Sequence, residues 1–109
     1  MAFDESSAER VRGIVVDDAR FAEKKMFGGI GFLLDGNMCV GIWKEYLVLR
    51  VGIDVWESLL QREFVRECDI TGRSMRGWVM VEPDGFDSDH QLKSWVKQAI
   101  AFTLTLPPG

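Results

Sequence analysis

Near both ends of the chain, apolar side chains recur every three or four residues, a spacing that places them on one side of a helix. We predict a first helix over residues 4–19 and a last helix that begins near Asp87 or Ser88. Pro107 ends the last helix, because proline lacks the amide donor that a further helical turn requires.

Between residues 23 and 51 the pattern changes to the alternation and short apolar runs that are typical of strands. Three strands are predicted as a meander, over residues 32–34, 38–43 and 46–51. Asp35-Gly36 tolerates the positive φ of a tight hairpin turn. Lys44-Glu45 is so short a polar break that its flanking strands must pair antiparallel.

The second half of the chain predicts a short helix followed by another hairpin. The helix covers residues 54–63 and has an apolar side, and Asp54 and Glu57 have the spacing of a capping box. The hairpin consists of strands over residues 68–71 and 75–82, joined by a turn that contains glycine.

These elements give the order α-β(3)-α-β(2)-α. Strands that are joined by short turns, with helices between groups of strands, predict a mainly antiparallel five-stranded sheet with helices packed on it. With 109 residues, of which 47% are hydrophobic, the chain is long enough to bury a core of its own. We therefore expect a single two-layer α+β domain over residues 1–109.

Neither side of the predicted sheet is clearly polar. One alternating set in the second and third strands consists of Met38, Val40, Ile42, Leu47, Leu49 and Val51. The opposite set includes Cys39, Gly41, Trp43, Val48 and Arg50. A sheet with helices on one side normally carries polar residues on the other. We therefore expect the second side to meet a partner chain or the remaining helix, and a homodimer formed through the sheet is the hypothesis.

Charge and cysteine content narrow the function classes. The net charge of −4 argues against a general polyanion-binding protein, because attraction to phosphates requires a positive field. Cys39 and Cys68 lack paired spacing, which indicates reduced thiols and a cytoplasmic location. A secretory signal and an apolar run of the ~20 residues that cross a bilayer are both absent from the sequence, so we expect no membrane association.

Four short motifs combine basic residues, glycines and aromatic residues in a distinctive way. They are Lys24-Lys25-Met26-Phe27-Gly28-Gly29, Asp35-Gly36-Asn37-Met38, Leu49-Arg50-Val51-Gly52 and Gly72-Arg73-Ser74-Met75-Arg76-Gly77-Trp78. Together with the opening helix they resemble the TfoX N-terminal domain family, named after the competence regulator TfoX. The resemblance covers nearly the whole chain and implies the α-β(3)-α-β(2)-α arrangement that is classed with the secretion-chaperone-like folds.

The sequence departs from the family pattern at Ser74, where proline is usual. TfoX also carries a second, C-terminal domain, whereas this sequence ends soon after its last predicted helix, so competence regulation carries over only in part. The resemblance brings no known catalytic residues to this chain.

The basic residues of the motifs are candidates for an interaction or anion site together with Trp78. The candidate residues are Lys24, Lys25, Arg50, Arg73, Arg76 and Trp78. Two simpler roles for these cations stay open: lysines on an edge strand prevent aggregation between sheets, and arginines pair with the surplus of acidic residues. Phe27 and Trp78 have rings that stack on bases, but aromatic residues in strands more often belong to the core.

The sequence offers little for catalysis. His90 is the only histidine, the glycines at 28–31 do not match a phosphate-binding loop, and no serine or cysteine has the context of a nucleophile. We expect no catalytic, cofactor-binding or metal-binding residues. The leading hypothesis is a non-enzymatic regulatory or adaptor domain that acts through protein association. The alternatives are a nucleic-acid accessory protein that uses the basic cluster and a small-molecule-binding domain.

Overall fold

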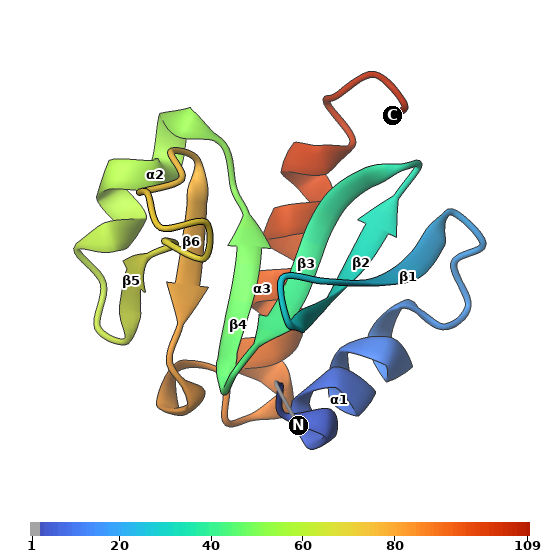
Figure 1. Ribbon diagram of the computed structural model, residues 1–109, viewed down its shortest axis with the longest axis horizontal. Coiled ribbons are helices and arrows are strands. Elements are labelled where there is room, and N and C mark those ends of the chain that lie inside the picture. Colours follow the sequence, from blue (N-terminus) through green and yellow to red (C-terminus); the bar gives the residue numbers. More distant parts are fainter. Residues whose placement is uncertain (1–2) are drawn as a thin grey trace.

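The computed structural model describes residues 3–109 and contains one antiparallel sheet with helices on one side of it (Figure 1). In chain order the elements are α1 (Glu5–Val15), β1 (Phe21–Met26), β2 (Gly29–Leu34), β3 (Asn37–Trp43), β4 (Tyr46–Arg50), α2 (Ile53–Leu60), β5 (Val65–Glu67), β6 (Trp78–Val81), a 3-10 turn (Pro83–Gly85) and α3 (Asp89–Thr103). The two-layer α+β class predicted from the sequence is confirmed.

The sheet has six strands in the order β1-β2-β3-β4-β6-β5, one more than predicted. The additional strand is β1, whose central residues are exposed. The apolar pattern does not predict it, because Glu23, Lys24 and Lys25 interrupt the alternation that marks a half-buried strand. As Figure 1 shows, β1 lies at one edge of the sheet and β5 at the other.

Two-residue turns join β1 to β2 and β2 to β3. In the second turn Asp35 and Gly36 have φ angles of 51° and 84°, which confirms the predicted tight hairpin. In the first turn Phe27 and Gly28 adopt the same left-handed conformation, with φ angles of 53° and 78°. Positive φ at both central residues defines the type I′ turn, whose twist suits antiparallel strands.

One hydrophobic core lies between the sheet and the three helices. The helices contribute Ala8 and Val11 from α1, Trp56 from α2, and Val96 and Ala99 from α3. They pack against the inward-pointing residues of the strands, which include Phe32, Val40, Ile42, Leu47, Leu49, Val79 and Val81. Because all three helices pack on the same side, the opposite side of the sheet has no helix on it.

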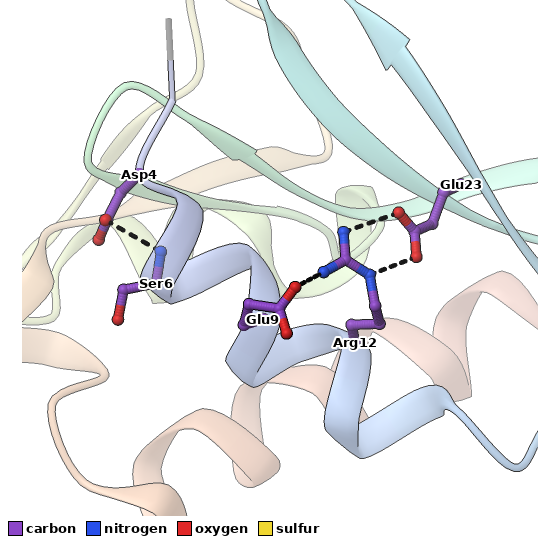
Figure 2. Close-up of polar contacts among 5 residues, drawn as sticks. All are labelled: Asp4, Ser6, Glu9, Arg12 and Glu23. Atoms are coloured by element: carbon purple, nitrogen blue, oxygen red, sulfur yellow. Dashed lines mark hydrogen bonds and ion pairs between the residues drawn. The ribbon is translucent and has the colours of Figure 1, made fainter. Parts of the chain in front are cut away.

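An arginine connects α1 to the edge strand β1. Arg12 donates through Nε and Nη2 to the two carboxylate oxygens of Glu23, at 2.6 and 2.9 Å, and also pairs with Glu9 (Figure 2). Asp4, also drawn in Figure 2, caps the start of α1 by accepting a hydrogen bond from the amide of Ser6 at 3.3 Å. The hydrogen bonds from Arg12 lower the pKa of Glu23.

A β-bulge in β3 changes which residues face the helices. Phe32 pairs with Val40, but the next residue of β2, Leu33, pairs with Met38, so Cys39 is an extra residue on β3. Cys39 is buried in the core. The alternation expected from the sequence is therefore wrong at this point, because Met38 lies on the side away from the helices while Cys39 lies on the helix side.

The second hairpin also differs from the prediction. Its strands, β5 and β6, lie farther apart in the sequence than predicted, and residues 68–77 form a loop between them. The loop is closed by a hydrogen bond from the Met75 amide to the Cys68 carbonyl, at 2.8 Å. Cys68, Ile70 and Met75 pack with Val48 and Met80 in a second, smaller apolar cluster. The loop buries these apolar side chains against the sheet. Its sequence pattern therefore resembles that of a strand.

The helix starts agree with the prediction at α3 but not at α2. Ser88 and Gln91 form a capping box at α3. At α2 the N-cap is Gly52, which has no side chain with which to cap, so the predicted box of Asp54 and Glu57 is wrong. Within residues 3–109, no helix combines the length and apolar character needed to cross a membrane.

Candidate functional site

A row of six paired residues crosses the side of the sheet that faces away from the helices, which we call the open face. From edge to edge, the Cα partners are Lys24, Gly31, Gly41, Val48, Met80 and Arg66. Paired residues of antiparallel strands point to the same side of a sheet. The open face therefore has a cation on each edge strand and small or apolar residues between them.

The two glycines at the centre of the row allow side chains to lie flat on the sheet. A Cβ atom on Gly31 would come within 2.6 Å of Met38 Sδ, and one on Gly41 within 2.8 Å of Met38 Cε. The end of the Met26 side chain also reaches Gly31, since Met26 Cε would be 3.3 Å from that Cβ. The open face thus has a floor of bare backbone, over which two methionines lie.

A groove of about 180 Å³ runs between these methionines and the loop formed by residues 68–77. Its lining includes Met26, Met38, Trp43, Val48, Met75 and Trp78. Of the described residues that line the groove, only Thr71 carries a hydroxyl or charged group. Methionine side chains are flexible and polarisable, so a surface built from them adapts to the shape of an apolar ligand. We call this site the apolar groove.

Phe27 stands at the edge of the apolar groove, in the turn between β1 and β2. Its side chain is 65% exposed, although it is large and apolar. Its carbonyl oxygen accepts a hydrogen bond from Trp43 Nε1 at 3.1 Å. A φ of 53° is unfavourable for a bulky side chain, and such strain is typical of functional sites. An exposed aromatic residue in this conformation contributes little to folding, so we take Phe27 to be part of the site.

Cations lie over the aromatic rings of the open face. Lys44 Nζ is 4.6 Å from the centre of the Trp43 ring, and Arg50 Cζ is 5.3 Å from that of Trp78. Arg66 Cζ lies 5.2 Å from the Tyr46 ring. Such contacts hold a cation in place without neutralising its charge.

Carboxylates do little to neutralise this side of the molecule. Arg66 lies 3.8 Å from Glu82. Within residues 3–109, Lys24, Lys44 and Arg50 have no carboxylate within 4.0 Å. Among the described residues, the open face therefore carries three cations without a carboxylate partner, although the whole chain has a net charge of −4.

The structure separates the basic residues that the sequence singles out. Lys24 points to the open face, whereas Lys25 pairs with Ile30 and so points to the helix side. Arg50 is paired with Trp78. The Cα atoms of Lys24 and Arg50 are separated by three strand spacings across the sheet and by two residues along the strands. The resulting distance is about 15 Å.

The two candidates from the loop lie in exposed positions. Arg73 is exposed near the tip of the loop. Arg76 Cζ is 5.9 Å from the centre of the Trp56 ring, and Trp56 Nε1 in turn donates to the carbonyl oxygen of Trp78 at 2.8 Å. Lys24, Arg50 and Trp78 thus lie on the open face, while Lys25 does not.

Sequence reasoning missed the apolar groove itself. Its methionines are Met26, Met38 and Met75, and Met38 lies over two strand glycines, Gly31 and Gly41, of which Gly41 lines the groove. The available signal was the presence of glycines inside strands, which often marks a close approach of other atoms to the backbone. That signal does not reveal that the two glycines are cross-strand partners.

The two cysteines are buried and free, as is usual for cysteines that serve only in packing. Burial raises the pKa of the Cys39 thiol to about 11, and burial also raises the pKa of Cys68. Both thiols are therefore protonated at neutral pH, and a protonated thiol is a poor nucleophile.

His90 is exposed in the first turn of α3. In the part of the chain that the structure describes, no three histidine, cysteine or acidic side chains are grouped as metal ligands.

Comparison with known proteins agrees with the motifs and the fold. Neither a curated protein nor a solved structure matches the chain. A family model described as the TfoX N-terminal domain matches residues 16–103, which include every strand, the apolar groove, α2 and α3, but not α1. The chain therefore belongs to the TfoX N-terminal domain family.

Proposed function

We propose that this chain is a non-enzymatic regulatory or adaptor domain that acts by binding another protein through its open face. The observation that carries the proposal is the apolar groove, with Phe27 exposed at its edge. Apolar surface that a chain leaves uncovered often marks an interaction site. Methionine walls suit a protein partner, because they can repack around its side chains.

Membership of the TfoX N-terminal domain family suggests that this association serves regulation. A role in transcription or in competence-type regulation is our proposal for the pathway, and the cytoplasm is the proposed location. The two buried free thiols support a reducing compartment. The proposal that the domain is not an enzyme is supported by the chemistry of the groove lining, which offers a hydroxyl at Thr71 but no acid, base or nucleophile in reach of it.

A second copy of the chain is one candidate partner, as the sequence predicts. Light scattering tests this form of association directly. A homodimer gives a mass near twice the 12.4 kDa of one chain, whereas a mass near 12.4 kDa at micromolar concentration contradicts it. The variant Phe27→Asn should reduce the dimer fraction if the open face is the interface.

Association with a different protein is tested by affinity capture with the immobilised domain. Gly31→Ala places a methyl group against Met38 and Met26, whose ends must shift and so change the wall of the groove, while the backbone has room for the change. We expect the captured partner to be lost with this variant. Gly13→Ala is the matched control, because a Cβ at Gly13 on α1 meets no atom within 4 Å. Equal capture by wild type and Gly31→Ala would contradict the proposal.

The cations without carboxylate partners favour a nucleic-acid role as the second candidate. Binding to phosphates would weaken as the salt concentration rises, by about 0.9 logarithmic units of affinity per contact for each logarithmic unit of salt. It would also survive Gly31→Ala, which changes no charge. Titration of labelled single-stranded and duplex DNA with both proteins distinguishes the two candidates.

A further inference from the structure

We infer that the open face takes an acidic peptide segment of its partner, with one large apolar side chain in the groove and carboxylates on the surrounding cations. This inference rests on the proposed function, because it specifies the chemistry of the partner at the same site. Three observations carry it: the size of the groove, the charge around it and the distance between the cations.

The size of the apolar groove limits what enters it. Its volume is about 180 Å³. An apolar cavity of roughly 150 Å³ accepts a benzene ring. The groove therefore holds one aromatic or large aliphatic side chain, and it is too small for an apolar face made of several such residues. Phe27 at its edge extends the contact beyond the inserted side chain.

The charge around the groove selects an acidic partner. Lys24 lies on β1, two residues before Met26 of the groove lining, and Lys44 and Arg50 lie over aromatic rings that also line the groove. None of the three has a carboxylate within salt-bridge distance in the described chain. Arg66 differs from these three cations, because the carboxylate of Glu82 lies 3.8 Å from it. Of the acids near the loop, Glu67 accepts a hydrogen bond from Ser74 at 2.6 Å.

The separation of the cations fits a short segment. The Cα atoms of Lys24 and Arg50 are about 15 Å apart. An extended chain covers that distance in roughly four to five residues. A segment with its apolar side chain in the centre and acidic residues on both sides therefore reaches both cations while the centre occupies the groove.

A second copy fits the same face less well. A two-fold dimer brings identical surfaces together. Two open faces in contact would place the unpaired cations Lys24, Lys44 and Arg50 of both copies at one interface, and such like-charge contacts oppose association. An acidic segment neutralises these cations instead.

The test is an NMR titration of the isotope-labelled chain with designed peptides. The probe has a central Phe with two Glu on each side, and it is acetylated and amidated. One control peptide has Lys in place of Glu, and the other has Ala in place of Phe. We expect the acidic Phe peptide to bind at least tenfold more tightly than either control. We expect the shifted amides to cluster at Gly31, Gly41 and the neighbouring residues of the open face.

Variants of the chain separate the contributions of shape and charge. Gly31→Ala and Phe27→Asn should each weaken binding about tenfold, because a buried apolar contact is lost or obstructed. Lys24→Gln and Lys44→Gln should each weaken it about threefold, and the effect should shrink in high salt. Lys97→Gln on α3 is the charge-matched control and should change nothing, since it lies in the helix layer.

Each contrary outcome overturns the inference in a recognisable way. Equal binding of the Lys peptide contradicts the charge argument, and equal binding of the Ala peptide contradicts the inserted side chain. If no peptide binds but Phe27→Asn still abolishes self-association or partner capture, the inference fails and the proposed function stands. If no peptide binds and no variant changes any association, both fail.

Discussion

Phe27 occupies a backbone conformation that its side chain disfavours. In the left-handed region the Cβ atom crowds the backbone, which costs roughly 1 kcal/mol for most residues but little for glycine or asparagine. The neighbouring β2–β3 turn has the same conformation and uses Asp35-Gly36, which suits it. The exposed ring of Phe27 does not offset this strain by burial. Under the proposed function, a partner that covers the ring offsets this cost.

Replacing Phe27 with asparagine separates folding from binding. Asparagine is favoured at this position of a type I′ turn, so we expect Phe27→Asn to raise the free energy of unfolding by about 0.5 kcal/mol while association weakens. Urea denaturation measures the first effect. A clear loss of stability would show that the ring already packs on the groove in the free protein.

Gly13 offers a test of helix propensity that leaves the open face untouched. It lies inside α1, with free space around the position of a Cβ atom. We expect Gly13→Ala to increase the free energy of unfolding by about 0.5–1 kcal/mol, because alanine loses less backbone entropy in a helix. Thermal unfolding followed by circular dichroism checks this. An unchanged melting temperature would indicate that α1 frays near its C-terminal end before the rest of the domain unfolds.

Arg12 and Glu23 connect an edge strand to a helix (Figure 2). β1 has only one neighbouring strand, β2, and its own residues are mostly exposed. A bidentate pair is geometrically specific. Both side chains are about one third exposed, so solvent weakens the pair and its contribution is of the order of 0.5 kcal/mol.

The pH dependence of this pair has a definite sign. Arg12 lowers the pKa of Glu23 in the folded state, so the pair stabilises the fold above the unfolded pKa of 4.5. The stabilisation disappears as the pH falls through the lower, folded-state pKa. We therefore expect Glu23→Gln to be less stable than wild type near neutral pH, by a difference that shrinks as the pH falls below the unfolded pKa. Denaturant titrations at a series of pH values measure the difference, and a constant difference would contradict the assignment.

Hydrophobic periodicity predicted the elements whose burial follows their own pattern, which are the helices and the strands β2, β3 and β4. It could not predict the bulge at Cys39, because one extra residue exchanges the two sides of the strand without changing its composition. It also interpreted Ile70 and Met75 as strand residues, because an apolar loop that covers a sheet resembles a strand in sequence. The position of Met38, which lines the groove, depends on the pairing of Gly31 with Gly41, and only the register of β2 and β3 reveals this pairing.

The molecule as a whole is asymmetric across its sheet. The helix side holds the main core, with residues from all three helices, whereas the open face holds a small cluster centred on Val48, Cys68 and Met80. The cluster is covered by the loop of residues 68–77 and not by a helix. Local opening takes less free energy where fewer apolar contacts must be broken, so we expect the loop side to open first.

The two free cysteines report on this asymmetry, since Cys39 lies in the main core and Cys68 in the small cluster. Both are fully buried, so each reacts with a thiol reagent only when its surroundings open. We expect Cys68 to be labelled at least tenfold faster than Cys39. Pulsed alkylation followed by mass spectrometry of peptide fragments measures both rates. Equal rates would mean that the two sides open together in one global transition.

The strand β1 takes part in both layers of the domain. Met26 lines the groove on one side, while Glu23 is held by Arg12 of α1 on the other. A ligand that displaces β1 must therefore also break the Arg12–Glu23 pair, so binding on one side is linked to the contact between β1 and α1 by no more than the roughly 0.5 kcal/mol of that pair. Under the proposed function, this ion pair is the contact through which binding at the open face reaches α1.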